Sequence, residues 1–154
     1  MRKRHELSCI YPVNIDNLWA DLLDPQALAE SMEGQITYEG LPTDPAFEGQ
    51  VAEVKLKRWG WLPIGAWTIE VLRRDDEKYI LESHEHGGII RSFRHRLELV
   101  AIDERHTRYT DYLDMDAGLM TPLMFLIFRR TYERRQQVRK ERLEHKTIMP
   151  SQAS

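Results

Sequence analysis

The chain has 154 residues and a formal net charge of −3, with 42% apolar and 31% charged residues. These values are typical of a soluble globular protein with one sizeable core, and they argue against a second domain. The longest apolar run, Leu119 to Phe128, is interrupted by Thr121 and Pro122 and is much shorter than the ~20 residues that a membrane-spanning helix needs.

The amino terminus and the cysteine content both bear on location. Three basic residues at positions 2–4 resemble the start of a signal peptide, but the polar His5 and Glu6 follow where an apolar run would be needed. Cys9 is the only cysteine, so no internal disulfide can form and nothing requires an oxidising compartment. We therefore expect a cytoplasmic protein.

The beginning of the chain reads as one strand followed by two short helices. Apolar residues alternate from Glu6 to Val13, which predicts a strand. Asn14 can cap a first short helix, and the pair Asp24-Pro25 starts a second one that continues to about Met32.

From Gly34 to Met115 the sequence alternates between strand patterns and turns. The predicted strands are 35–39, 51–59, 66–72, 79–86, 89–102 and 107–115. Gly87-Gly88 is expected to form a tight hairpin between two of them. Together with the first strand they predict an antiparallel sheet of seven strands, one face of which must be covered.

The last predicted element is a long helix from Thr121 to about Lys146. Thr121 can cap it, and Pro122 suits its first position because the missing N–H costs nothing there. The run Leu123 to Phe128 has no polar face, so we expect protein to cover it on nearly every side. This helix is the only element large enough to cover the sheet, which should therefore curl around it.

The second half of this helix is basic, and its apolar stripe is interrupted. Arg135, Arg139 and Arg142 fall in the same sector as Tyr132 and Leu143. Arginine stems commonly cover apolar surface while their heads stay in water. Alternatively, the guanidinium groups enter a wet cavity and meet acidic partners. A basic helix can also attract anionic lipid, but no groove-reading motif accompanies it, so nucleic-acid binding is not expected.

Six short segments carry a resemblance to a known superfamily. They are Pro12 to Trp19, Asp24-Pro25, Tyr79 to Ser83, Phe93 to His95, Thr107 to Asp111 and Ala117 to Pro122. In this order they resemble the START-like and Bet v 1-like (SRPBCC) proteins, and most of all the polyketide cyclase/dehydrase-like bacterial branch, whose members mostly lack an assigned reaction. The resemblance covers Glu6 to about Leu143.

The resemblance implies an α+β helix-grip fold, in which a curved antiparallel sheet of seven strands wraps around the long C-terminal helix and two short helices follow the first strand. We expect one such domain over residues 1–146 and a tail over 147–154. It also implies a deep cavity between sheet and helix that holds a hydrophobic or amphipathic small molecule. It does not imply a reaction, because this fold hosts carriers, sensors and enzymes.

The Gly87-Gly88 hairpin suggests which polar residues face such a cavity. If these glycines form a two-residue loop, strand residues pair across it in a defined register. The pairs on one face would then be Ile80 with His95, Glu82 with Phe93, and His84 with Arg91. Leu97 and Leu99 continue the same face, so we expect it to be the concave one.

Two interpretations of this expected wall stay open. In the first, Glu82 or His95 acts as acid or base on a carbonyl ligand, and Arg91 or Tyr112 holds its oxygen. In the second, the charged residues form an ion-paired rim, and His95 is a core histidine hydrogen-bonded to a neighbour such as Asp111.

The candidate ligand contacts come from the strands and from the long helix. They are Trp59, Trp67, Glu82, His84, Arg91, Phe93, His95, Asp111, Tyr112, Phe125, Phe128 and Tyr132. His84 and His86 share a strand face, but no dependable third ligand accompanies them, so we expect neither a metal nor another cofactor.

Three tryptophans surround the loop 60–65. Trp59, Trp61 and Trp67 could form an aromatic lip over the cavity, or an exposed tip that meets a membrane or a second subunit. Alternatively, Trp59 and Trp67 are ordinary strand aromatics and only Trp61 is exposed.

The leading functional expectation is non-covalent binding of a small hydrophobic molecule, such as a lipid, an aromatic polyketide-like compound or a quinone, for transport or sensing. The first alternative is a cyclase- or dehydratase-type enzyme. The second is interaction with a protein or an anionic membrane through the tryptophan loop or the basic helix. We expect no membrane insertion, membrane contact that is at most transient, and a monomer or a homodimer.

Overall fold

The computed structural model of the chain describes residues 1–148. Its elements follow one another in the predicted order. They are β1 (Arg2–Tyr11), α1 (Ile15–Leu23), α2 (Pro25–Ser31), β2 (Ile36–Glu39), β3 (Val51–Arg58), β4 (Leu62–Asp75), β5 (Ile80–Gly87), β6 (Ile90–Ala101), β7 (Thr107–Asp116), the 3-10 turn η1 (Gly118–Met120) and α3 (Thr121–Ile148). The predicted sequence of strands and helices is confirmed.

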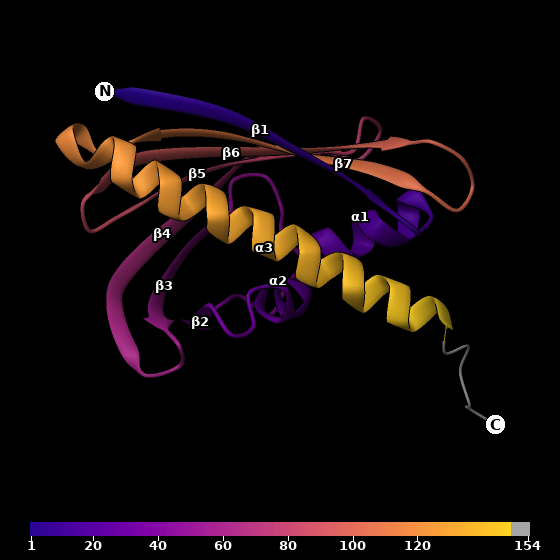
Figure 1. Cartoon of the computed structure of the whole chain (residues 1–154), viewed down its shortest axis with the longest axis horizontal. Helices are drawn as coiled ribbons and strands as arrows, with labels where there is room; N and C mark the ends of the chain where they lie inside the picture. Colours follow the sequence, from indigo (N-terminus) through magenta and orange to yellow (C-terminus); the bar gives the residue numbers. More distant parts are fainter. Residues whose placement is uncertain (149–154) are drawn as a thin grey trace.

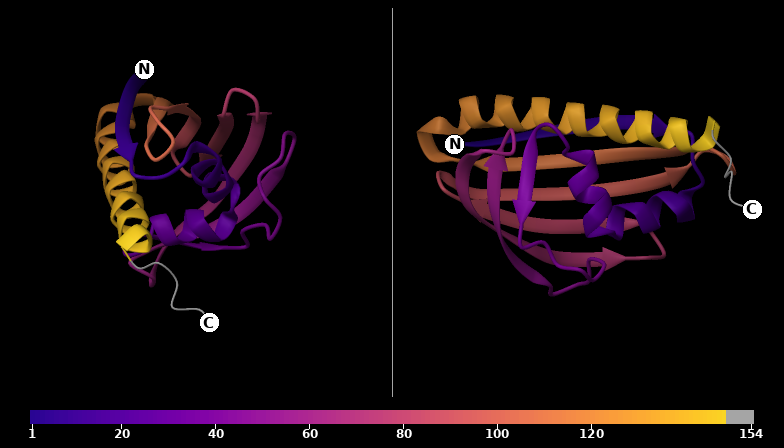
Figure 2. Two further views of the ribbon diagram at one scale, coloured as in Figure 1. Left: turned by 90° about the vertical axis from the view of Figure 1, so that its right-hand side faces the viewer. Right: turned by 90° about the horizontal axis from the view of Figure 1, so that it is seen from below.

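The strands form one antiparallel sheet in the order β1-β7-β6-β5-β4-β3-β2. Strands that follow one another from β2 to β7 are neighbours, and β1 pairs with β7 so that Arg2 lies opposite Asp116. Figure 1 shows α3 running along the sheet beside β1, while β3 and β4 curve away beneath it. Seen end on, the sheet curls round and α1 and α2 lie inside the curve (Figure 2). The expected curved sheet around a long helix is confirmed.

The two short helices begin at the predicted caps. Asn14 Oδ1 accepts a hydrogen bond from the backbone N–H of Asp16 at 2.9 Å. Asp24 Oδ1 accepts one from the N–H of Gln26 at 2.9 Å, and Pro25 occupies the first turn. Each cap satisfies an amide that would otherwise have no partner in the first turn of its helix.

The beginning of α3 differs from the prediction. The hydroxyl of Thr121 accepts a hydrogen bond from the N–H of Ala117, so it ties the helix to the preceding turn. Leu119 is 96% exposed, and Leu123 and Leu126 are also exposed. The prediction that protein covers this part on nearly every side is therefore wrong. The helix packs on a single layer of sheet, and no second layer covers its outer side.

Two apolar clusters fill the space between the helices and the sheet. The cluster near α1 contains Tyr11, Leu18, Trp19, Leu22, Leu23, Leu97, Leu99, Tyr109 and Leu143. The cluster under the first half of α3 contains Val54, Trp67, Ile90, Phe93, Leu113, Met115, Ala117 and Tyr132. Besides threonines, the buried polar residues of β6, β7 and α3 are His95, Asp111, Arg135, Gln136 and Arg139. We call these five residues the polar layer.

The β5–β6 hairpin has a different register from the predicted one. The observed pairs are Leu81 with Leu97, Ser83 with His95, and Glu85 with Phe93, with a register shift between Glu85 and Gly87. All three predicted pairs are wrong. A Cβ at Gly87 would lie 2.4 Å from the carbonyl oxygen of Ala66, so the chain approaches β4 there as only glycine can. The resulting bulge exchanges the two faces of β5.

The ends of several elements also differ from the expected ones. β1 starts at Arg2, four residues early, because β7 offers it a partner as far as Asp116. β4 starts at Leu62, inside the expected loop. α3 continues to Ile148, two residues into the expected tail, and residues 149–154 lie outside the described residues. In the described part of the chain, no helix is both long and apolar enough to cross a membrane.

Candidate functional site

A pocket of about 120 Å³ opens between α2, the loop 41–50 and the inner face of strands β2 to β6. Its apolar lining consists of Leu22, Leu23, Pro25, Leu28, Leu41, Pro42, Ala46, Ala52, Ile69, Val71, Leu81 and Leu97. Its polar lining consists of Asp24, Tyr38, Gln50, Ser83, Glu85, His95, Tyr132 and Arg135. The expectation was a deep cavity between the sheet and the long helix. The long helix contributes Tyr132 and Arg135 to this pocket, and the rest of the lining comes from the sheet, the two short helices and the loop 41–50.

Hydrogen bonds hold the outer wall of this pocket against the sheet. The backbone N–H of Ala46 donates to the carbonyl of Leu23 at 2.9 Å, and Arg74 Nη1 donates to the carbonyl of Ala46 at 2.9 Å. Farther along the loop, the N–H of Gly49 donates to the carbonyl of Val71 at 2.8 Å. The loop 41–50 is thus fixed to both α1 and β4 although it has no regular secondary structure.

The best-connected polar group of the polar layer is the carboxylate of Asp111, which is fully buried. His95 Nε2 lies 2.5 Å from Asp111 Oδ1, and the hydroxyl of Tyr109 donates to the same oxygen. Gln136 Nε2 donates to Oδ2 at 2.8 Å. The interpretation of His95 as a core histidine hydrogen-bonded to Asp111 is confirmed.

The charge state of Asp111 follows from its neighbours. Burial by itself raises the pKa of Asp111, but His95, Arg135 and the Tyr109 hydroxyl outweigh burial and hold that pKa below the usual carboxyl value. Asp111 accepts a hydrogen bond from Nε2–H of His95. Nδ1 of His95 has no hydrogen-bond partner among residues 1–146, so it can form a hydrogen bond with a bound molecule.

Two phenols stand beside this histidine in the pocket lining. Burial raises the pKa of Tyr38 to about 12, and burial raises the pKa of Tyr132 well above its usual range. Both therefore stay protonated at neutral pH. Neither hydroxyl has a partner in the described part of the chain, so each can donate a hydrogen bond to a bound molecule.

Glu85 is one of two acidic residues in the pocket lining, the other being Asp24, and the predicted register missed Glu85. Its Oε2 accepts from Trp67 Nε1 at 2.8 Å, and its Oε1 accepts from the Ser83 hydroxyl at 2.9 Å. Ser83 and Glu85 face inward because the bulge beside Gly87 exchanges the faces of β5. The local sequence shows a glycine pair at the hairpin, but it does not fix the register, which the pairing of β5 with β6 reveals.

The three arginines of the α3 stripe all turn inward. Arg135 is 6% exposed and Arg139 is 1% exposed. Arg142 Nη2 donates to Asp21 Oδ1 at 2.8 Å and to Oδ2 at 2.6 Å, and its Nη1 bonds Glu30. Arg139 Nε forms a 3.6 Å ion pair with Asp21 Oδ2.

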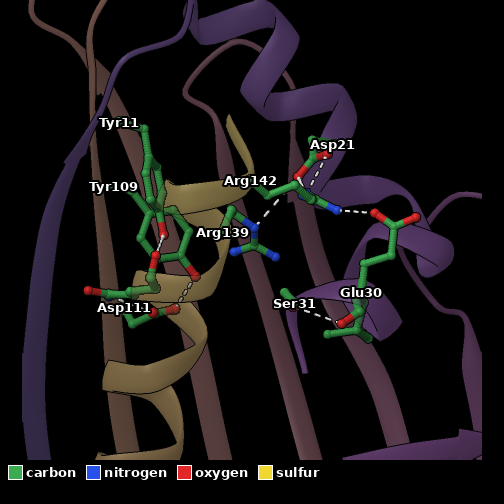
Figure 3. Close-up of polar contacts among 10 residues, drawn as sticks. Tyr11, Asp21, Glu30, Ser31, Tyr109, Asp111, Arg139 and Arg142 are labelled. Atoms are coloured by element: carbon green, nitrogen blue, oxygen red, sulfur yellow. Dashed lines mark hydrogen bonds and ion pairs between the residues drawn. The ribbon is translucent and has the colours of Figure 1, made fainter. Parts of the chain in front are cut away.

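Figure 3 shows Arg139 and Arg142 of α3 pointing toward Asp21, with Tyr109 on the other side of Arg139. The interpretation in which these guanidinium groups stay in water is therefore wrong. They enter the interior, and two of them meet acidic partners, as in the alternative. The reason is tertiary, since α1 and α2 bring Asp21 and Glu30 over this face of the helix.

Only two of the predicted ligand contacts, His95 and Tyr132, line the pocket. Phe93 and Trp67 are buried in the cluster under α3, and Phe125 and Phe128 pack against it. Asp111 lies behind His95 and reaches the pocket only through that ring. Whether a ligand touches any of these residues stays a prediction.

Three predicted contacts lie on the outer face of the sheet. The register shift turns Glu82 and His84 outward, whereas Tyr112 alternates with the buried Asp111 and Leu113 along β7. Glu82 pairs with Arg96 across the strands, and His84 Nε2 lies 3.1 Å from the hydroxyl of Ser92. The ring of Tyr112 lies 4.7 Å from the guanidinium of Arg96. The inward placement expected for these side chains is therefore wrong.

Two further candidates are at the ends of strands, away from the pocket. Arg91 is exposed, and its guanidinium packs beside Gly118. Trp59 is 56% exposed and stacks loosely on Trp61, which is 70% exposed, with ring centroids 6.3 Å apart. Neither tryptophan lines the pocket, so the lip interpretation is wrong. The alternative was that only Trp61 is exposed. Trp67 is buried, as that alternative requires, but Trp59 is exposed, which the alternative did not allow. Trp59 and Trp61 together therefore form an exposed aromatic tip on the hairpin.

Among the residues that the structure describes, no three side chains of His, Cys, Asp or Glu gather closely enough to hold a metal ion. The rings of His84 and His86 approach each other, with centroids 5.9 Å apart, on β5.

Comparison with known proteins places this geometry in a fold. The sequence matches no family model and no curated relative. The Zhui aromatase/cyclase from Streptomyces sp. R1128 has a TM-score of 0.74 at 14% identity, over 96% of this chain and 96% of that one. Norcoclaurine synthase from Thalictrum flavum has a TM-score of 0.71 at 11% identity, over 95% and 97%. A START superfamily protein from Mycobacterium smegmatis has a TM-score of 0.70 at 12% identity, over 92% and 97%.

The chain has the helix-grip fold. The predicted α+β helix-grip architecture is thereby confirmed, with the long C-terminal helix that its neighbours share. Because carriers and enzymes share this fold, the function has to be argued from the pocket.

Proposed function

We propose that this protein binds a small hydrophobic or amphipathic molecule in the pocket between α2 and the inner face of the sheet, as a carrier or sensor. One observation carries the proposal. The pocket has a continuous apolar lining on which Tyr38, His95, Tyr132 and Arg135 converge, which is the usual composition of a small-molecule site. A neighbour with the same fold, norcoclaurine synthase, was solved in complex with a transition-state analogue.

Filling the pocket from β3 tests the proposal. Ala52 lines the pocket, while the next residue, Glu53, is exposed on the other face of the strand. The variant Ala52→Phe places a ring in the space that a ligand would occupy. We expect it to bind the neutral fluorescent probe N-phenyl-1-naphthylamine about 10-fold more weakly than the wild type, the equivalent of about 1.4 kcal/mol.

The control is Glu53→Phe, which adds the same ring outside and should leave the affinity unchanged. Circular dichroism would show that both variants keep the fold. Equal affinity of Ala52→Phe and the wild type, or no binding of the probe to the wild type, would contradict the proposal. Native mass spectrometry of gently purified protein would then identify any molecule that occupies the pocket.

A second candidate function, acid–base catalysis on a bound carbonyl compound, is favoured by the pair of His95 and Asp111. Asp111 holds Nε2, which leaves Nδ1 as the base, and a cyclase- or dehydratase-type reaction needs such a group. Glu82 has no part in it, since it lies on the outer face.

Proton exchange tests this second candidate. Wild-type protein should accelerate deuterium exchange at the methyl group of 2-acetylnaphthalene in D2O, followed by NMR. The variant His95→Gln should lose about 100-fold of that acceleration, because general-base catalysis is typically of this size. His84→Gln, on the outer face, is the control. Equal rates for all three proteins would remove catalysis from consideration.

A further inference from the structure

The side chain of Arg135 is a buried cation without a dedicated anion. It is 6% exposed, it lines the pocket, and its Nε has no hydrogen-bond partner. Among residues 1–146 it forms no ion pair with a carboxylate. A guanidinium stays charged in proteins, and removing such a charge from water without a partner is costly.

The carboxylates near Arg135 already have other partners. Asp111 Oδ1 bonds His95 and Tyr109, and Asp111 Oδ2 accepts from Gln136. Both oxygens of Glu85 accept from Trp67 and Ser83. The remaining contact of Arg135 is the ring of Tyr132, whose centroid lies 5.0 Å from the guanidinium carbon. A ring face attracts a cation but does not neutralise it.

The opposite part of the pocket is apolar. Leu28, Leu41 and Ile69 belong to its lining, and they come from α2, the loop 41–50 and β4. A molecule that fits both parts has an apolar body and one negative group. Tyr38 and Tyr132 can add hydrogen bonds to the same group because they stay protonated.

We propose that the ligand of this pocket is an organic acid with an apolar body, and that Arg135 binds its carboxylate. This inference rests on the proposed binding function and names the chemical class of its ligand. Guanidinium and carboxylate form paired, charge-assisted hydrogen bonds, which are about twice as strong as neutral ones.

Matched acid and alcohol pairs test this inference on the full chain. Isothermal titration would compare decanoate with decan-1-ol, and 2-naphthoate with 2-naphthalenemethanol, which separates aliphatic from aromatic acids. Wild-type protein should bind the acid of at least one pair 10-fold or more tightly than its alcohol, as expected from about 1.5 kcal/mol for a hydrogen bond to a charged group. The variant Arg135→Met should bind acid and alcohol within about 3-fold of each other.

Two further variants complete the design. Arg129→Met removes the same charge from the exposed side of α3 and should keep the preference for the acid. Arg135→Gln keeps a polar side chain and should lose the preference, which provides a second variant if Arg135→Met does not fold. The melting temperature of each Arg135 variant serves only to show that the variant folds, because Arg135 also favours the ionised form of Asp111 and its loss removes that stabilisation.

Each outcome decides one point. Equal affinity of wild-type protein for acid and alcohol would overturn the carboxylate inference and leave the binding function standing. A preference that persists in both Arg135 variants would overturn the role of Arg135. If wild-type protein binds neither member of either pair, the binding function itself fails, and this inference fails with it.

Discussion

Replacing Asp111 with asparagine is expected to lower the free energy of unfolding by about 3 kcal/mol at neutral pH. The reason is that removing one member of a buried ion pair leaves the charge of the other member buried and uncompensated. The carboxylate is fully buried and accepts from His95, Tyr109 and Gln136. An amide of the same shape cannot accept all three bonds, and it removes the negative charge whose ionised form His95 and Arg135 favour. Urea unfolding followed by tryptophan fluorescence would measure the loss.

The effect of this substitution should depend on pH in a defined direction. The pKa of Asp111 is lower in the folded protein than in the unfolded chain, although burial opposes this, because His95 and Arg135 favour the ionised form. Its stabilising contribution is therefore complete above the unfolded value of about pH 4, and it is lost as the pH falls through the lower folded pKa. The difference between wild type and Asp111→Asn should be constant above about pH 5 and shrink below it.

Asp114→Asn is the control for this prediction. Asp114 lies on the same strand but on the outer face, where it pairs with Arg2 and Arg4. Partly exposed pairs of this kind contribute at most about 1 kcal/mol. If both variants lost equal stability, Asp111 would not be the centre of the polar layer.

Replacing Asp21 with asparagine is expected to cost about 3 kcal/mol of unfolding free energy for the same physical reason. Asp21 is the acidic partner of Arg139, which is almost fully buried, and it also accepts two hydrogen bonds from Arg142. In the variant, Glu30 still pairs with Arg142, so Arg139 is the residue whose buried charge loses its acidic partner. Chemical unfolding at pH 7 would measure the loss.

A double variant distinguishes the cost of the uncompensated charge on Arg139 from the cost of the lost contacts of Asp21. If the charge on Arg139 causes the loss, then adding Arg139→Met to Asp21→Asn should recover part of the stability, because the buried charge disappears together with its need for a partner. Glu133→Gln breaks the exposed pair with Arg129 and should cost less than about 0.5 kcal/mol. A double variant less stable than Asp21→Asn would show that Arg139 stabilises the fold by packing alone.

The polar layer links these stability predictions to the proposed function. His95 and Arg135 belong to it and also line the pocket. An all-apolar interior would avoid the cost of desolvating these groups, and replacing buried ion pairs with apolar residues is often neutral or stabilising. Buried charge that faces a pocket is a feature of sites that bind or react with polar groups. The exposed aromatic tip at Trp59 and Trp61 lies outside this arrangement.

The residues that the local sequence identified well are those whose partners are near in the chain. Asn14 and Asp24 cap helices through amides two residues away, and both caps are confirmed. Inward positions along β1 and β6 also follow from simple alternation, so Tyr11, Phe93 and His95 are buried as expected. The predicted hydrogen-bond partner of His95 is confirmed as well, because Asp111 lies on the inward face of the neighbouring strand β7.

The sequence by itself determined the order of the elements, the antiparallel sheet around one long helix and the contact between His95 and Asp111. Caps, turns and alternation act over a few residues, so the local sequence encodes them. Only the tertiary structure decided which residues form the pocket. A bulge beside Gly87, where β4 leaves no room for a side chain, places Glu82 and His84 on the outer face. The inward turn of Arg142 depends on Asp21, 121 residues away in the sequence. Such contacts follow from packing between distant segments, and no local pattern encodes them.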